Sequence, residues 1–509
     1  MSGALLTRRV AHGATALRGG GPRWRPTPYL VFGGLFWLVM SLAFWRVPMC
    51  CDFGQHAAVV ERLKENLLHP AHPMADLPGD GSAYYSPYAV AQGLFAKATG
   101  LAGWEVVKLS GPLNLLVLLT GIGRFVRALT ARPWAPVLAL CAMVLLWGTR
   151  MAWWSGYLGL MSMTGNLGYP STFAIGLAFW AWAWAGALVR GPRRSPWAYV
   201  GLGALCGVIL LVHPISSVAA VIGVVAFAAS GRTVWPWAAT AVTAAALAVV
   251  WPYYSVFSLV GDPSVDGIHR QLYTEMPQRF WLALLGLPAL WLRLRRDRRD
   301  PLVLMFALDC AVVGYGWVSG HYTYGRILGL TLVPLQFALA SELAAARPWG
   351  WRRGALAGAA ALGACVGFCQ LQAGAVVPRA LDPVGFDQPP RWPGYTWAVG
   401  HMRRGDVVLT DGYRPTRSVP GYGANLVAPA WPDPSLDEHV RDVRLKAVHD
   451  YLAPGSTRAE RAEIVRRYRV RWLLLEPEQK APPEAVVVDW SPRTGEVLAR
   501  VNGAGQRRT

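Results

Sequence analysis

Long hydrophobic runs recur along most of this chain and are separated by short polar segments. Runs of roughly 17 to 22 apolar residues match the length of an α-helix that crosses a bilayer, and a helix satisfies its own backbone hydrogen bonds inside lipid. The pattern therefore predicts an α-helical polytopic membrane protein with about eleven transmembrane helices. The expected spans are residues 29–45, 106–122, 133–147, 172–189, 197–212, 215–229, 235–251, 280–292, 302–320, 327–345 and 355–371.

Charged residues lie mainly in the loops between the expected spans. They make up only 15% of the chain, and the formal net charge of +20 comes from short arginine clusters, so we infer no nucleic-acid binding. Alternating the spans collects most clusters on one side, which the positive-inside rule places in the cytoplasm together with the N-terminus. The first loop, 46–105, and everything after residue 371 are then expected outside. The clusters on the cytoplasmic side fall within 124–132, 190–194, 293–299 and 347–353.

The composition changes after residue 372, where charged residues and prolines become more frequent. Residues 406–411 and 471–476 are typical of short buried strands, and 436–452 and 457–467 are typical of helices. A segment of roughly 130 residues is large enough for a core of its own. The expected domains are a cytoplasmic tail at 1–28, a transmembrane bundle at 29–372, an extracytoplasmic α/β domain at 373–500 and a disordered tail at 501–509.

The first external loop is polar and has an internal periodicity. Residues 55–68 and 86–100 each place apolar side chains on one helical face, which is typical of amphipathic helices that lie on a membrane surface. A hinge rich in proline, glycine and aspartate, 70–81, separates them. We expect the two helices to form a shelf over the bundle, next to an acid, Asp52, that directly follows the first span.

Asp52 is the first candidate for chemistry. A partly desolvated carboxylate can take a proton from a hydroxyl, so Asp52 fits a general base. A helix cap is an equally good interpretation, because Gln55 follows three residues later as in a capping box. His56 lies one turn further, where it would bind a phosphate or support Asp52, although a lone histidine is more often structural. Asp76 and Asp80 add oxygens, but too few ligands are assignable for a hard-metal site.

Basic residues near other external helix ends are candidates for binding an anion. Arg326 begins a span, where its guanidinium would clamp a phosphate bidentately; the alternative is an arginine that extends to the membrane interface. His213 precedes Pro214 in a helix break, and backbone groups freed by such a break normally line a cavity. The external loops also carry Arg270 and His321.

These features together resemble the GT-C superfamily of integral membrane glycosyltransferases. The resemblance covers nearly the whole chain: a first span, a large external loop that begins with an acid, a bundle of this size and an external α/β domain. In the sequence, residues 51–56 are similar to the family's Asp and downstream His pattern, 84–88 to its Tyr/Pro element, and 408–411, 419–425 and 468–475 to a recurrent bacterial extracytoplasmic module.

The resemblance implies roles for individual residues. Asp52 would be the base that deprotonates the acceptor hydroxyl, and basic residues near external helix ends would hold the donor phosphate. Several family members carry paired acids where Cys51 and Phe53 flank Asp52 here. This departure favours a transfer without a metal, so we expect no cofactor and leave a divalent metal as the open alternative. The expected substrate-binding residues are His56, Tyr85, His213, Arg270, His321 and Arg326.

The predicted function is an inverting glycosyltransferase of the bacterial plasma membrane. It would move a sugar from a polyprenyl-phosphate donor to an extracytoplasmic acceptor such as cell-wall glycan, lipoglycan or an exported protein. The competing class is a transporter or flippase for lipid-linked glycans, although only Asp309 lies clearly within a span and coupled transporters usually need more buried acids. A scaffold with a sugar-binding exterior is a third interpretation.

Overall fold

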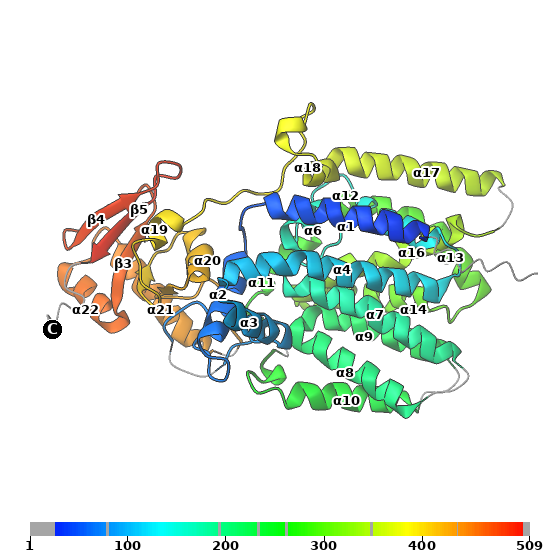
Figure 1. Cartoon of the computed structure of the whole chain (residues 1–509), viewed down its shortest axis with the longest axis horizontal. Coiled ribbons are helices and arrows are strands. Elements are labelled where there is room, and N and C mark those ends of the chain that lie inside the picture. The colour runs from blue at the N-terminus through cyan, green and yellow to red at the C-terminus, as the bar shows by residue number, and fades with distance from the viewer. Residues whose placement is uncertain are drawn as a thin grey trace, which may run out of the picture.

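A bundle of helices makes up most of the molecule, and a smaller α/β domain lies at one end of it (Figure 1). The expected tails at 1–28 and 501–509 fall almost wholly outside the residues that the structure describes. The computed structural model describes residues 26–77, 81–191, 195–231, 235–259, 263–346, 350–434 and 436–501.

Six helical stretches of the described chain are long and apolar enough to cross a membrane: α1 (Pro28–Arg46), α4 (Gly103–Leu129), α7 (Pro170–Arg190), α14 (Pro301–Ser319), Tyr322–Leu343 and Trp351–Val376. The fifth comprises η4 (Tyr322–Ile327), α15 (Leu328–Thr331) and α16 (Val333–Leu343), and the sixth comprises α17 (Trp351–Gly367), the π-helix η5 (Phe368–Gln372) and α18 (Ala373–Val376).

Shorter apolar helices complete the bundle, and all of the expected spans fall on helical segments. That each of them crosses the membrane, and hence the count of about eleven, stays a prediction. The shorter helices are α5 (Ala135–Leu145), α8 (Pro196–Val212), α9 (Pro214–Ser230) and α10 (Trp237–Val249), and the expected span 280–292 is formed by η3 (Trp281–Gly286) and α13 (Leu287–Arg296).

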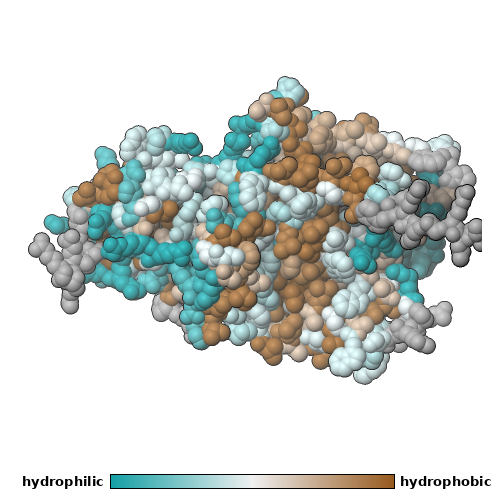
Figure 2. All heavy atoms as spheres, viewed as in Figure 1, coloured by the Kyte–Doolittle hydropathy of each residue, from teal (hydrophilic) through white to brown (hydrophobic). Residues whose placement is uncertain are grey.

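Hydrophobic side chains form a band across the bundle on the face that Figure 2 shows. Figure 2 shows this band over the helices, with hydrophilic residues gathered on the α/β domain and again at the opposite end. Helix α1 contributes large apolar side chains that the protein leaves uncovered, such as Leu35 and Leu42, which are 56% and 59% exposed. Lipid covers a surface of this kind without cost, so the structure supports a multi-pass membrane protein.

Short helices connect the spans at the end of the bundle near the α/β domain. Helices are confirmed at both stretches expected to be amphipathic, 55–68 and 86–100, as α2 and α3, but Gln55, Glu61 and Arg62 on α2 are buried and do not form an exposed polar face. The two helices touch closely, because a Cβ on Gly93 would lie 2.3 Å from the Cβ of Leu63. The short helices are α2 (Phe53–Glu65), α3 (Pro87–Thr99), α6 (Leu160–Asn166), η1 (Val256–Leu259), α11 (Asp266–His269), η2 (Arg270–Tyr273) and α12 (Met276–Phe280).

A five-stranded sheet forms the centre of the α/β domain. The strand order is β2-β1-β3-β5-β4; β1 runs parallel to β2 and β3, and β5 runs antiparallel to β3 and β4. The strands expected at 406–411 and 471–476 are confirmed as β1 and β3. The strands are β1 (Val407–Leu409), β2 (Asn425–Leu426), β3 (Val470–Leu475), β4 (Ala485–Trp490) and β5 (Val497–Val501).

Helices cover both faces of this sheet. Along β3, Leu473 and Leu475 pack in the cluster that includes α21 and α22, whereas Trp472 and Leu474 face the opposite cluster. Thr457 is the N-cap of α22 and forms a capping box with Glu460. The helices of the domain are α19 (Thr396–Val399), α20 (Pro415–Ser418), η7 (Val419–Tyr422), α21 (Glu438–Leu452) and α22 (Arg458–Tyr468), and the short η6 (Arg379–Leu381) lies in the segment between α18 and the domain.

Polar contacts join the α/β domain to the first loop. Arg444 donates to the carbonyl of Asp76 across 2.8 Å, and Arg404 lies 3.1 Å from the carboxylate of Glu61, which is buried on α2. Helix α2 also packs directly against α20 and η7. The domain is thereby held over the beginning of α2, where Asp52 lies.

Candidate active site

Asp52 lies at the turn between α1 and α2. Cys51, just before it, has a left-handed φ of 55°. The Tyr169 hydroxyl accepts the backbone N–H of Asp52 across 3.1 Å and donates to the carbonyl of Cys50 across 3.2 Å. The Asp52 carboxylate caps no helix within the described chain; instead its Oδ1 accepts the indole N–H of Trp431 across 2.9 Å. Asp52 thus stands at the N-cap position of α2, but its side chain makes no capping bond and the expected capping box with Gln55 is absent.

Asp52 borders two cavities that meet at its side chain. The first cavity has a volume of about 300 Å³ and the second about 310 Å³. Substrate pockets usually measure roughly 300 to 1,000 Å³, so the pair has room for two reacting groups. The residues that line both cavities are Asp52, Tyr84, Ser155, Tyr169, Ile215, Val265 and Arg326.

The two cavities differ in their remaining walls. The first extends between α2, α3 and the break between α8 and α9, and the second extends toward the α/β domain. Walls of the first include Gln55, His56, Ala89, Gln92, His213 and Pro214. Walls of the second include Cys51, Trp153, Trp154, His269, Tyr413 and Trp431.

Arg326 is the cation at the junction of the cavities. Its Nη2 lies 3.4 Å from Nε2 of His213. On the other side of the ring, Nδ1 of His213 accepts the backbone N–H of Ser216 across 3.2 Å and lies 2.9 Å from the Ser216 hydroxyl oxygen, so His213 caps the beginning of α9. The Nε of Arg326 is buried and has no hydrogen-bond partner among the described residues. A buried cation with an unused donor beside a cavity is suited to an anionic ligand.

The surroundings of Asp52 favour base chemistry. Burial raises the pKa of the Asp52 carboxyl, while the N–H of Trp431 and the charges of Arg417 and Arg326 act in the opposite direction. A carboxylate whose pKa is raised toward neutrality accepts a proton more readily. Burial also lowers the pKa of His56 to about 4, so its imidazole is neutral at physiological pH.

Residues of the α/β domain complete the second cavity. The guanidinium carbon of Arg417 lies 3.8 Å from the ring centroid of Tyr413 and 4.4 Å from that of Trp431. Arg417 also donates to the carbonyl of Tyr413 across 2.8 Å. Sequence reasoning missed these three residues, because the loops that carry them have no periodicity and meet Asp52 only through domain docking.

The structure brings together some of the residues predicted from the sequence. His56, His213 and Arg326 all line the first cavity with Asp52. Tyr85, in contrast, is fully buried and donates its hydroxyl to the carbonyl of Ala71. Its neighbour Tyr84 lines both cavities instead.

Two predicted residues lie away from the walls that the structure describes for the two cavities. Arg270 is exposed and stacks over Tyr322 at 6.0 Å. His321 is half-exposed, with Nδ1 3.2 Å from the carboxylate of Asp266. His269, the residue before Arg270, does line the second cavity, and its Nδ1 lies 2.8 Å from the Thr323 hydroxyl oxygen.

No cluster of three or more histidine, cysteine or acidic side chains suited to a metal ion occurs in the described part of the chain. Asp76 forms an ion pair with Arg469 of the α/β domain, so this carboxylate already has a cationic partner. Asp80 lies outside the described residues. The absence of a metal requirement stays a prediction.

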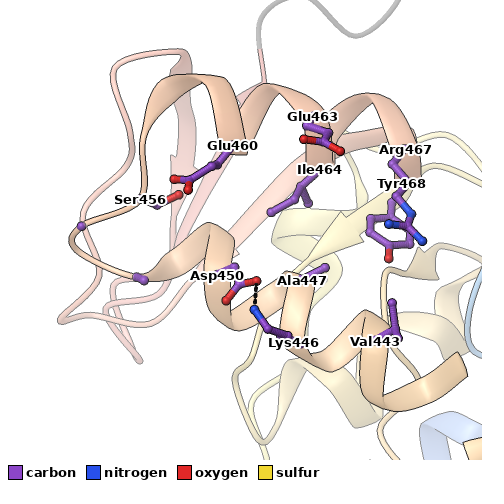
Figure 3. A pocket seen from close by; sticks show the side chains of 12 residues that line it. Val443, Lys446, Ala447, Asp450, Ser456, Glu460, Glu463, Ile464, Arg467 and Tyr468 are labelled. Atoms are coloured by element: carbon purple, nitrogen blue, oxygen red, sulfur yellow. Dashed lines mark hydrogen bonds and ion pairs between the residues drawn. The ribbon is translucent and has the colours of Figure 1, made fainter. Parts of the chain in front are cut away.

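A separate groove of about 520 Å³ lies between α21 and α22 (Figure 3). Lys446 and Asp450 on one side pair with each other across 2.5 Å, and Glu460 accepts from the cap residue Thr457. The charged side chains of this groove therefore pair with neighbours or are of mixed sign, and they do not converge on one point. The junction of the two cavities, which both Asp52 and Arg326 line, is the better candidate for chemistry.

No family model and no curated protein matches this chain. Solved structures of membrane glycosyltransferases are similar to it. Arabinofuranosyltransferase AftD from Mycobacteria has a TM-score of 0.57 at 17% identity over 93% of this chain, which spans only 40% of AftD. ArnT from Cupriavidus metallidurans bound to undecaprenyl phosphate has a TM-score of 0.55 at 14% identity, over 94% of this chain and 98% of ArnT. Such identities show the fold alone, and the GT-C fold expected from the sequence is confirmed.

Proposed function

We propose that this chain is an inverting membrane glycosyltransferase that uses a polyprenyl-phosphate sugar as donor and Asp52 as general base. The observation that carries the proposal is that Asp52 and Arg326 line both cavities. Transfer from a sugar phosphate needs a base for the acceptor hydroxyl and a cation for the departing phosphate at the same place. The GT-C fold, shared with an ArnT structure that contains undecaprenyl phosphate, supports the donor class.

The chemistry follows from these two groups. Asp52 takes the proton of the acceptor hydroxyl as its oxygen forms a bond to the anomeric carbon of the sugar. The bond between that carbon and the phosphate oxygen breaks, and its electron pair leaves with the phosphate. Arg326 balances the negative charge of the phosphate, with its unused Nε as a further donor. A single displacement of this kind inverts the anomeric centre.

The walls of the cavities suggest how the substrates are arranged. The first cavity holds the donor head group, because His213 and Arg326 lie there beside the break between two apolar helices. The second cavity holds the acceptor, because it extends to Tyr413 and Trp431 of the α/β domain. A cell-wall glycan, a lipoglycan or an exported protein would supply the hydroxyl. We further propose that the domain lies outside the plasma membrane, with the N-terminus in the cytoplasm.

The deciding experiment follows a radiolabelled sugar on polyprenyl phosphate in vesicles that contain the full chain and candidate acceptors. Transfer of label to a glycan or protein identifies a glycosyltransferase, and Asp52→Asn is expected to slow this transfer by orders of magnitude. Movement of the intact lipid-linked sugar across the membrane without transfer identifies the flippase alternative. Binding without transfer or movement would leave only the scaffold interpretation and would overturn the proposal.

A further inference from the structure

The 431–434 segment of the α/β domain is clamped beside the candidate site. Trp431 and the next residue line the second cavity, and the residue at 434 lines the first. Between them, Asp433 accepts the hydroxyl of Ser82 and the backbone N–H of Ala83, and its carboxylate lies 3.6 Å from Nε2 of His72. These partners belong to the first loop, so both loop and domain fix the backbone that carries Trp431.

The indole of Trp431 is also held from its face. The buried Arg417 is stacked between this ring and that of Tyr413, with its guanidinium carbon 4.4 Å from the Trp431 centroid. The backbone of Arg417 touches the helix that Asp52 precedes, because a Cβ on Gly54 would lie 2.2 Å from the Arg417 carbonyl oxygen. The stack is therefore fixed relative to Asp52.

This arrangement acts on one oxygen of the Asp52 carboxylate. The indole N–H can only donate, so its bond to Oδ1 is strongest when the carboxylate is ionised. With Oδ1 engaged, Oδ2 is left to meet the acceptor hydroxyl. Arg417 acts on the same carboxylate through its charge, which favours the ionised form of Asp52.

We propose that Trp431 and Arg417 are positioning residues for the base: Trp431 orients the Asp52 carboxylate, and Arg417 holds the indole and favours the negative charge. The α/β domain is then part of the catalytic machinery. This inference rests on the proposed role of Asp52 as general base and adds that its working state depends on the second domain.

The variants leave the other titratable groups that face Asp52 in place, including the Cys51 thiol, whose pKa is lowered by its hydrogen bond with Cys50. Burial raises the pKa of the Tyr84 and Tyr169 hydroxyls and lowers that of His56, so these three stay uncharged near neutral pH. All facing groups except Arg417 remain unchanged in the variants used. The facing groups are Cys50 and Cys51 in the preceding turn, His56 on α2, Tyr84 in the first loop, Tyr169 before α7, Arg326 on η4 and Arg417 on α20.

The test compares pH profiles of sugar transfer by the full-length protein. Trp431→Phe keeps an aromatic ring for the stack and removes only the N–H. We expect kcat to fall roughly 10- to 100-fold, the donor KM to change little and the acidic limb of kcat/KM to move to higher pH, because the ionised carboxylate has lost a donor. Arg417→Gln is expected to move the limb in the same direction. Arg417→Lys keeps the charge and should leave the limb closer to its original position.

Trp472→Phe is the matched control. Trp472 also donates its indole N–H to a carboxylate across 2.9 Å, but that carboxylate is Asp406 beside the sheet of the α/β domain. Its loss should lower thermal stability while leaving the pH profile unchanged.

Three outcomes are distinguishable. In the first, Asp52→Asn loses transfer while Trp431→Phe and Arg417→Gln both keep the wild-type rate and the wild-type acidic limb of kcat/KM. That result would overturn the positioning role alone. Full transfer by Asp52→Asn would overturn the proposed function itself. If Trp431→Phe fails to fold, the acidic limb of kcat/KM measured for Arg417→Gln decides. A shift of this limb to higher pH supports the inference, and an unchanged limb refutes it.

Discussion

Trp431 and Asp52 are 379 positions apart in the sequence, yet the indole nitrogen of one lies 2.9 Å from the carboxylate of the other. Arg326, which belongs to the bundle, lines the same two cavities as Asp52. The carboxylate is thus surrounded by a neutral donor from the α/β domain and a cation from the bundle. Changes on these two sides should have different effects on sugar transfer.

Asp52→Asn is expected to lower turnover by roughly 10²- to 10⁴-fold, the usual contribution of a general base. It should not lower stability. Burial raises the pKa of Asp52, so stability falls as pH rises from the unfolded value, about 4, to the higher folded value. Asparagine removes that cost and still accepts the Trp431 N–H. Thermal unfolding at pH 7 should therefore give an equal or higher midpoint.

Asp406→Asn is the control, and its effect on thermal stability is expected to be opposite to that of Asp52→Asn. Asp406 also accepts an indole N–H, but its hydrogen bonds to Arg403 and Trp472 and the charge of Arg471 hold the pKa of its carboxyl below its usual value despite burial. It therefore contributes stability above the unfolded pKa, which is lost as pH falls through the folded pKa. The variant should melt at a lower temperature and keep turnover per folded molecule. Undiminished transfer by Asp52→Asn would remove Asp52 from the mechanism.

Arg326→Gln is expected to raise the donor KM or lower kcat/KM roughly 10- to 100-fold, because a charge-assisted contact to phosphate is lost. Transfer kinetics at varied donor concentration measure this. Arg270→Gln is the comparison, since Arg270 is exposed and stacked over Tyr322 outside the described cavity walls. Equal losses in the two variants would mean that the phosphate is not bound at the junction of the cavities.

His56→Gln is expected to leave the acidic limb of kcat/KM where it is. Burial lowers the pKa of His56 to about 4, so the imidazole is already neutral over the pH range in which a membrane enzyme is assayed. Any loss of rate should then be the same at pH 6 and pH 8. A limb near pH 6 to 7 that disappears in His56→Gln would show that this histidine titrates during turnover.

Treatment with a metal chelator is expected to leave transfer unchanged. The proposed step uses the Asp52 carboxylate as base and Arg326 as the counter-charge, and Asp76 is already paired with Arg469. The measurement is the transfer rate before and after dialysis against EDTA, with readdition of Mg²⁺ or Mn²⁺. Loss of activity that either ion restores would assign a metal to the site.

Gly54→Ala is expected to loosen the docking of the α/β domain. The added Cβ would lie 2.2 Å from the Arg417 carbonyl oxygen, and overpacking of this kind costs about 1 to 3 kcal/mol. Transfer and thermal stability should fall together. Gly34→Ala on α1 is the control, because no atom of the described residues lies within 4 Å of its added Cβ. Wild-type behaviour of Gly54→Ala would contradict the tight contact.

Local pattern predicted the bundle and much of the site. The periodicity of the first loop indicated α2, and Asp52 and His56 follow from their places before and within that helix. Arg326 and His213 were identified because each lies at the end of an apolar segment, where a charged or polar side chain needs a partner or a ligand.

The remaining site residues depend on contacts that no local pattern reveals. Tyr84 and not Tyr85 lines the cavities, and His269 and not Arg270 does so, because irregular loops do not fix the direction of each side chain by periodicity. Trp431 and Arg417 depend on how the second domain docks on the first loop. That docking combines many polar contacts between distant segments and leaves no signal in one sequence.

The separation of Asp52 and Trp431 along the chain also has a consequence for biosynthesis, because the two residues are synthesised at different times. A ribosome that has produced the whole helical bundle has not yet made the indole that meets Asp52. The nascent protein can occupy its membrane while the proposed catalytic centre is still unfinished. Activity would then begin only when the α/β domain has folded, so translation products that end before Trp431 would be inert.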